Sequence, residues 1–106
     1  MRDDDRAYIC RLLDIYGAAL SDRRRDLCDL YYNEDLSLSE ISENCGLSRQ
    51  GVRDAVKHAV DELFALEKSL RFAARFDRIA DLTDSIVRSS DVNEIHGLAL
   101  QITGEL

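Results

Sequence analysis

Residues 36–57 decide the fold, and they read LSLSEISENCGLSRQGVRDAVK. Ser37 followed by Glu40 predicts a capping box, in which each side chain accepts a hydrogen bond from the other residue's backbone N–H. Ser48 is expected to cap a second helix. Gly46 lies between the two starts, where the end of a helix favours a residue that tolerates positive φ. A short helix, a turn with a glycine and a second helix together form the helix-turn-helix pattern.

Apolar residues repeat at spacings of three and four along both helices, as they do on the buried face of an amphipathic helix. The first helix is expected to bury Leu38, Ile41 and Cys45, and the second Val52, Val56 and Ala59. Outward-facing residues of the second helix are Arg49, Gln50, Arg53, Asp54 and Lys57. Its three cations recur every four residues and so form a line along one side of the helix.

That exposed face has two interpretations. In helix-turn-helix proteins the first turns of the second helix enter the major groove, where Arg and Gln read guanine and adenine edges. The alternative is an ordinary solvated helix face. Under the first interpretation the first helix also offers hydroxyl and N–H groups to phosphate at its N-terminus. The predicted DNA-binding residues are then Arg49, Gln50, Arg53, Asp54, Lys57, Ser37 and Ser39.

Length and composition favour a soluble all-α protein. The 106 residues are 45% apolar and include five glycines and no proline, without alternating β-branched runs. No apolar run approaches the roughly 20 residues that span a bilayer. Residues 1–6 are acidic and lack the apolar core of a secretory signal, so a cytoplasmic location is expected. Asp5 is expected to cap the first helix, with Asp3 and Asp4 at the positive end of its dipole.

A net charge of −7 argues against a protein that binds nucleic acid with its whole surface. Residues 48–71 are close to electrical balance, so DNA affinity is expected to be modest and salt-sensitive. If about three cations per subunit meet phosphates, the log–log salt slope is roughly −2.7 per subunit. The run Arg23–Arg25 either contacts phosphate or forms salt bridges with Asp22, Asp26 and Asp29.

The residues indicate no enzyme, metal site or cofactor. Three cysteines, at positions 10, 28 and 45, lack any Cys-x-x-Cys spacing, so buried free thiols are expected. His58 and His96 are isolated and do not suggest a catalytic triad. A nucleotide-binding glycine loop is absent from the sequence as well.

The helix that begins near Ser48 has no glycine or proline stop after Gly51 until Gly97. Its apolar residues keep a heptad spacing through Ala73, which is typical of a helix that needs a partner. We expect a helix-turn-helix domain over residues 1–74, with its motif at 37–57 and a long helix at 48–74. The seam either meets a second copy or folds against the C-terminal helices. Its predicted dimerisation residues are Leu63, Leu66, Leu70 and Ala73.

Residues 75–106 are expected to form a helical appendage. One amphipathic pattern covers residues 75–89, and Asp91 with Glu94 resembles a capping box for a final helix. The junction with the long helix is left open by the sequence: a kink, a break and a continuous helix are all compatible with it.

The motif resembles region four of bacterial primary sigma factors, which reads the promoter −35 element. It is more similar to the small YlxM-like helix-turn-helix family, over roughly residues 12–70. The similarity includes Leu12-Leu13-Asp14-Ile15-Tyr16, Leu30-Tyr31-Tyr32, Asp35-Leu36-Ser37-Leu38 and the run from Ser48 to Lys57. This resemblance implies a sigma-region-four-like all-α fold. The heptad spacing adds the expectation that the long recognition helix extends into a dimerising C-terminal helical segment. The resemblance also implies a role connected with the signal recognition particle pathway.

Two functions follow as hypotheses. The first is a homodimeric, cytoplasmic regulator that binds DNA and is associated with the signal recognition particle pathway. The second is an interaction module that kept the fold without specific DNA binding. Its partner would be the GTPase of that particle or its RNA, and neither hypothesis involves a membrane.

Overall fold

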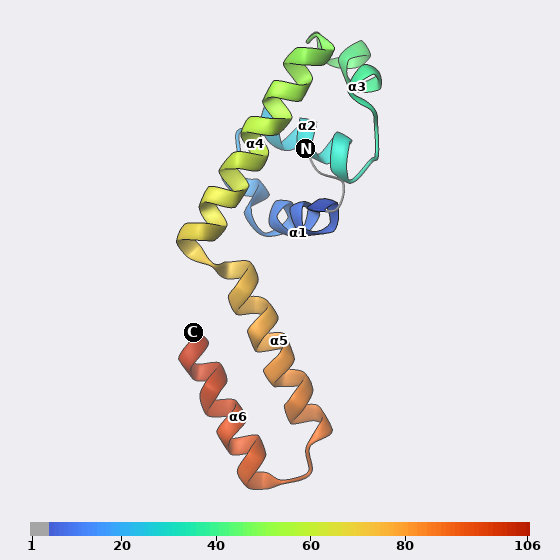
Figure 1. The fold of residues 1–106 in the computed structure, drawn as a ribbon. Coiled ribbons are helices and arrows are strands. Elements are labelled where there is room, and N and C mark those ends of the chain that lie inside the picture. Colours follow the sequence, from blue (N-terminus) through green and yellow to red (C-terminus); the bar gives the residue numbers. More distant parts are fainter. Residues whose placement is uncertain (1–4) are drawn as a thin grey trace. The chain divides into compact units, whose positions relative to one another are not determined.

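The structure, a computed structural model, describes residues 5–106, and all regular secondary structure within that range is helical (Figure 1). The predicted all-α class is therefore confirmed. Asp3 and Asp4, expected near the first helix dipole, lie outside the described residues. The elements are α1 (Arg6–Tyr16), the 3-10 helix η2 (Gly17–Ala19), α2 (Asp22–Tyr32), α3 (Leu38–Cys45), α4 (Arg49–Leu70), α5 (Phe72–Arg88) and α6 (Val92–Glu105).

The chain forms two compact units, Met1–Leu70 and Arg71–Leu106. The boundary falls where α4 ends, four residues before the expected end of the long helix at residue 74. Arg71 causes this break, because its φ of 59° is left-handed and cannot continue a right-handed helix. No residue type at position 71 indicates this break, since a left-handed helix end usually carries glycine or asparagine.

One face of α4 forms the centre of the first unit, where α1, α2 and α3 pack against it (Figure 1). The buried residues of α4 are Val52, Val56, Ala59, Val60 and Leu63. Those of the three packing helices are Ile9, Leu12, Leu13, Tyr16, Leu27, Cys28, Tyr32 and Ile41. Full burial of one aliphatic side chain of this size contributes about 1.5–3 kcal/mol, so this stripe is the main source of stability.

The core extends further along α4 than the sequence suggested. Leu63 is completely buried (0% exposed), so it belongs to the core and cannot contact a second chain. Beyond it, the Tyr16 hydroxyl donates a hydrogen bond of 2.6 Å to Glu67 Oε1, which ties α1 to the second half of α4. Ala73 is also buried, in α5, so neither of these two predicted dimerisation residues exposes surface in the described structure. Of the predicted dimerisation residues, only Leu66, which is half-buried, and Leu70, which is exposed, keep accessible surface.

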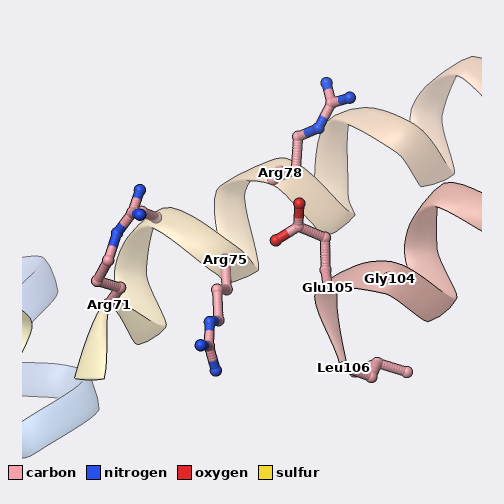
Figure 2. A pocket seen from close by; sticks show the side chains of 7 residues that line it. Arg71, Arg75, Arg78, Gly104, Glu105 and Leu106 are labelled. Carbon is pink, nitrogen blue, oxygen red and sulfur yellow. The ribbon is translucent and has the colours of Figure 1, made fainter.

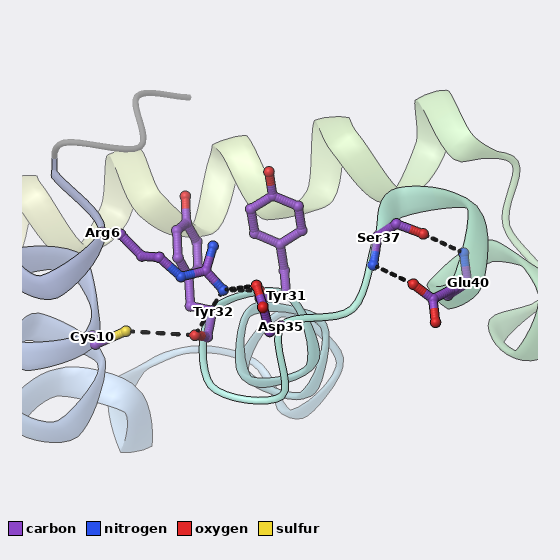
Figure 3. Close-up of polar contacts among 7 residues, drawn as sticks. All are labelled: Arg6, Cys10, Tyr31, Tyr32, Asp35, Ser37 and Glu40. Atoms are coloured by element: carbon purple, nitrogen blue, oxygen red, sulfur yellow. Dashed lines mark hydrogen bonds and ion pairs between the residues drawn. The ribbon is translucent and has the colours of Figure 1, made fainter.

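Arg6 connects α1 to the segment that leads into the helix-turn-helix motif (Figure 3). Its Nη2 donates to the backbone oxygens of Tyr31 and Tyr32, at 2.7 and 3.0 Å. These carbonyls belong to the last turn of α2, where intrahelical partners are missing. The same atom lies 2.9 Å from Asp35 Oδ1, and the guanidinium also faces both tyrosine rings. Arg6 thereby stabilises the turn at Asp35, whose φ of 57° is left-handed.

The other local expectations for the first unit had mixed outcomes. Asp5 precedes α1, but its side chain makes no capping hydrogen bond. Ser21 does cap α2, since its hydroxyl accepts from the Arg24 N–H. All three thiols are free, and Cys28 is completely buried, which with the charge of Asp29 raises its pKa to about 11. The other two cysteines are only half-buried, contrary to prediction, because Cys10 lies at the edge of the apolar face of α1 and Cys45 is the last residue of α3.

The second unit is an antiparallel hairpin of α5 and α6 (Figure 1). Only Ala73 and Leu82 are buried in α5, and α6 buries no residue. Asp91 caps α6 as predicted, accepting from two backbone N–H groups of its first turn. The reciprocal half of the expected box is missing, because the Asp91 N–H donates to Ser89 Oγ instead of Glu94.

Replacing Arg6 with alanine is expected to lower the free energy of unfolding by about 1–2 kcal/mol, because two backbone carbonyls and Asp35 lose a charged donor. Urea denaturation followed by far-UV circular dichroism measures this change in the free energy of unfolding. Lys68→Ala on exposed α4 surface is the control, with an expected change within about 0.5 kcal/mol. Equal effects of the two substitutions would show that the Arg6 contacts contribute nothing specific.

Candidate nucleic-acid interface

The first helix of the motif begins with the predicted capping box. The Glu40 N–H donates to Ser37 Oγ, and the Ser37 N–H donates to Glu40 Oε1, both at 3.1 Å (Figure 3). Hydrogen bonds from the backbone and hydroxyl of Ser37 lower the pKa of Glu40, since they stabilise its charged form. The box fixes where α3 begins, and so it sets the entry to the motif.

The turn between the helices also follows the sequence prediction. Gly46 has a φ of 77°, which reverses the chain after α3. Ser48 then caps α4, because its Oγ accepts from the Gly51 N–H at 3.0 Å. A Cβ on residue 51 would lie 3.2 Å from this oxygen, which accounts for a glycine in the first turn. These contacts fix the direction in which α4 leaves the turn.

Arg23 holds the end of α3, a role that sequence reasoning missed. Its Nη2 donates to the Cys45 backbone oxygen at 3.2 Å. The neighbouring Arg25 pairs with Asp22 at 3.5 Å, as one of the two alternatives predicted. Arg24 instead lies 3.8 Å from Glu62 on α4, outside the acids that were considered. The basic run on α2 therefore stabilises the two helices of the motif. Its partners on those helices are distant in sequence, so the local spacing of charges could not predict them.

The five predicted α4 residues are all exposed, whereas Val52 and Val56 of the same helix are buried. Within residues 5–106, the structure gives neither Arg49 nor Arg53 a hydrogen-bond or ion-pair partner. Their guanidinium groups are therefore available to an external anion or base edge, which they can bind through two N–H groups at once.

The other polar residues on this side are engaged with acidic neighbours. Gln50 Nε2 donates to Asp54 Oδ1 at 2.9 Å, and Lys57 Nζ lies 3.6 Å from Asp61 Oδ2. Exposed pairs of this spacing contribute only about 0.3–0.5 kcal/mol, so a ligand can displace them at small cost. Asp54 reduces the positive potential beside Arg53, and in this arrangement it also orients the amide of Gln50.

The two serines of the first helix differ in what they offer. Both the N–H and the hydroxyl of Ser37 are used in its contacts with Glu40. Ser39 is half-buried, and its backbone oxygen accepts from Ser42 Oγ. The structure thus gives Ser37 a clear structural role, while the two arginines carry the accessible charge.

In the described part of the chain, no three His, Cys, Asp or Glu side chains are placed to hold a metal ion together. Nor does any described helix combine the length and apolar character needed to cross a membrane.

Comparison with known proteins places this geometry in a family. The family model of UPF0122, described as “Putative helix-turn-helix protein, YlxM / p13 like”, matches residues 3–100. The chain belongs to the UPF0122 family. The match also covers α5 and most of α6, where the sequence alone offered only a pattern.

Several bacterial UPF0122 proteins are similar to this chain over most of its length. The one from Thermoanaerobacter sp. (strain X514) is 39% identical over 90 residues, covering 85% of this chain and 77% of the relative. A Clostridium kluyveri protein is also 39% identical over 90 residues, covering 78% and 81%. One from Malacoplasma penetrans is 41% identical over 78 residues, covering 73% and 72%.

Substitution of Gly46 tests the turn that positions the interface. Gly46→Ala is expected to cost about 1–2 kcal/mol of unfolding free energy, because a Cβ disfavours positive φ although nothing crowds the site. Gly46→Asn is the matched control, since asparagine tolerates this conformation better than alanine does. If both variants unfold at the same urea concentration as the parent, the left-handed turn is not needed.

Proposed function

We propose that this protein is a helix-turn-helix regulator that binds duplex DNA in the cytoplasm. The observation that supports this most strongly is the pair of unpartnered arginines, Arg49 and Arg53, on the first two turns of the helix that follows the motif's turn. Gln50 and Lys57 would contribute to the same DNA-contacting face once their contacts with acidic neighbours are broken. We infer a binding role rather than an enzymatic one, in keeping with a helix-turn-helix family.

We further propose that the regulator acts as a homodimer. Two recognition helices about 34 Å apart would read successive major grooves on one side of a duplex. Accessible apolar surface remains at the C-terminal end of α4, where Phe64 and Leu70 are 37% and 39% exposed. Leu66 is half-buried on the same side of α4 as Leu70, whereas the Phe64 ring lies on another side, 5.7 Å from the Tyr8 ring. Leu66 and Leu70 therefore remain in the proposed contact, without the fully buried Leu63.

The association with the signal recognition particle pathway rests on the resemblance to YlxM-like proteins. Under the alternative function, the same fold would bind the GTPase of that particle or its RNA. The net charge of −7 favours this alternative over a strong DNA binder. The two unpartnered arginines at the start of α4 favour duplex DNA, which is why we place it first.

Selection from a random duplex library at low and physiological salt tests the DNA-binding proposal. Arg49→Ala with Arg53→Ala is expected to abolish the enriched motif, since both base contacts and phosphate contacts are lost. On a fixed duplex, the double variant should reduce the magnitude of the log–log salt slope by roughly 1.8, or about 0.9 per cation.

The control removes two positive charges elsewhere, as Lys68→Ala with Arg88→Ala, and should retain the motif. Asp54→Ala should raise affinity, because it removes a negative charge from the face. No enrichment at either salt would contradict DNA binding. A pull-down that then recovers the particle's GTPase or RNA would support the alternative function.

Leu70→Glu is expected to weaken the dimer at least tenfold, because it places a charge in an apolar contact. Sedimentation equilibrium measures the dimer dissociation constant. Leu100→Glu, at an exposed site on α6, is the control and should leave it unchanged. Monomerisation by the control alone would assign the dimer contact to the hairpin instead of α4.

A further inference from the structure

The hairpin of α5 and α6 buries few side chains for a unit of its own. Residues 71–106 form a compact unit, yet α5 buries only Ala73 and Leu82, and α6 buries no residue. Units of fewer than about 40 residues usually need disulfides, a metal ion or oligomerisation for stability. This unit contains no cysteine. Nor do its side chains, all within the described part of the chain, form a cluster that could hold a metal ion. Of these three means, oligomerisation remains.

Both helices of the hairpin leave apolar side chains exposed to solvent. Phe76 and Val87 of α5 are 46% and 77% exposed, and Val92 of α6 is 77% exposed. Two small apolar residues, Ala80 on α5 and Ala99 on α6, are exposed as well. We call these five residues the hairpin face.

Helix geometry places the hairpin face on one side of the two helices. The line along which they pack follows their more buried apolar residues, Ile79, Leu82, Ile86, Ile95, Leu98 and Ile102. Ala80, Val87 and Ala99 each come one residue after a member of this line, which is a rotation of about 100° in the same sense. Phe76 lies one turn before Ala80, and Val92 two turns before Ala99. Because α5 and α6 are antiparallel, equal rotations away from their contact bring both strips to the same side of the hairpin.

Charge is unevenly divided along the length of the hairpin. Residues 71–78 carry three arginines and one acid, and they lie beside the end of α6, where Glu105 adds a second acid. Residues 81–94, around the connection between the helices, carry four acids and one arginine. The end at which α5 begins is therefore weakly positive, and the end at which the chain turns into α6 is strongly negative.

Arg75 carries a free positive charge at the edge of the hairpin face. Figure 2 shows its side chain projecting away from Arg71 and Arg78. Its helical neighbours on that side are the apolar residues Phe72 and Ile79, at spacings of three and four. Within residues 5–106 the structure gives Arg75 no hydrogen-bond or ion-pair partner. A carboxylate of a partner chain is the group that would complement it.

We propose that the hairpin face docks on the same face of a second copy of this chain, with the two hairpins antiparallel in a four-helix bundle. Antiparallel packing places the positive end of each hairpin beside the negative end of the other, whereas parallel packing would bring the two acidic ends together. The proposal rests on the homodimer proposed above, and it adds the hairpin face to the contact at Leu66 and Leu70.

Ala80 and Ala99 mark the centre of the proposed contact. The Arg78 side chain donates to Gln101 Oε1 at 2.9 Å, which aligns these two positions across the hairpin. Ala80 is two residues further along α5, and Ala99 is two residues earlier in α6, so the alanines lie at the same level. In the antiparallel bundle each alanine meets its own counterpart, and the small side chains allow the helices to approach closely.

Sedimentation equilibrium of the full chain measures the effect on the dimer dissociation constant. Ala80→Glu is expected to raise it at least tenfold, because two like charges then meet at the centre of the contact. Residue 80 is exposed in the single chain, so the hairpin itself should still fold, which circular dichroism melting checks. Leu100→Glu is the matched control, since residue 100 is turned about 100° further from the hairpin face than Ala99, and it should leave the constant unchanged.

Disulfide cross-linking tests the direction of packing. The half-buried Cys10 and Cys45 are first replaced by serine, and the completely buried Cys28 is kept. Mild oxidation should then link Ala80→Cys chains to one another, and likewise Ala99→Cys chains. Leu100→Cys is the control and should stay unlinked.

A change of charge at each end of the hairpin tests the complementarity. Arg75→Glu should weaken the dimer threefold or more in 50 mM salt and less in 1 M salt, where the screening length is only about 3 Å. Arg88→Glu makes the same change of charge at the negative end and should not weaken the dimer. Equal weakening by both variants would contradict the antiparallel arrangement.

The remaining outcomes separate this contact from the homodimer itself. Weakening by Ala80→Glu together with self-linking of Ala80→Cys supports the proposal. A dimer that Leu70→Glu weakens and Ala80→Glu does not would overturn the hairpin contact and leave the homodimer standing. Linking only in a mixture of Ala80→Cys and Ala99→Cys chains would mean parallel packing and overturns the proposal. A parent that stays monomeric overturns both proposals.

Discussion

Burial of one face of α4 is the constraint on which the rest of the first unit depends. Val52, Val56 and Leu63 are completely excluded from solvent, and three other helices supply the surfaces that cover them. Because a helix has only one rotation that buries this stripe, the same packing decides which residues of α4 face outward. Arg49 and Arg53 are thus held on solvent-exposed turns by contacts made on the opposite side of the helix. A recognition surface needs this kind of rigid support.

Polar contacts complement this packing at the ends of the helices, where backbone groups lack partners. The capping box of Ser37 and Glu40 starts α3, Arg23 binds its last turn, and Ser48 starts α4. Arg6 likewise donates hydrogen bonds to backbone oxygens in the last turn of α2. The paired tyrosines at positions 31 and 32 are therefore part of the scaffold beneath the motif. Burial also raises the pKa of Tyr32 to about 12.

Much of the motif could be predicted from sequence because its signals are local. The Ser37 box, the glycine turn and the amphipathic spacing each involve residues a few positions apart. The Arg6 contacts join residues 25 and more positions apart, so no spacing rule reveals them. Arg71 could not be predicted as a helix break, because it is neither glycine nor asparagine.

The heptad spacing correctly marked apolar positions of α4. It could not distinguish a core position from a dimer contact, and Leu63 is a core residue. The pairing of Gln50 with Asp54 follows the four-residue helix rule and was within reach of the sequence.

We propose that the exposed first turns of α4 form the surface that contacts duplex DNA. The test is to titrate ¹⁵N-labelled protein with a selected duplex and to follow the amide chemical shifts. We expect the largest shift changes at residues 48–57, slightly smaller ones at the turn containing Gly46, and little change along the far end of α1. Changes confined to residues 71–106, or to the surface of α2, would contradict this proposal.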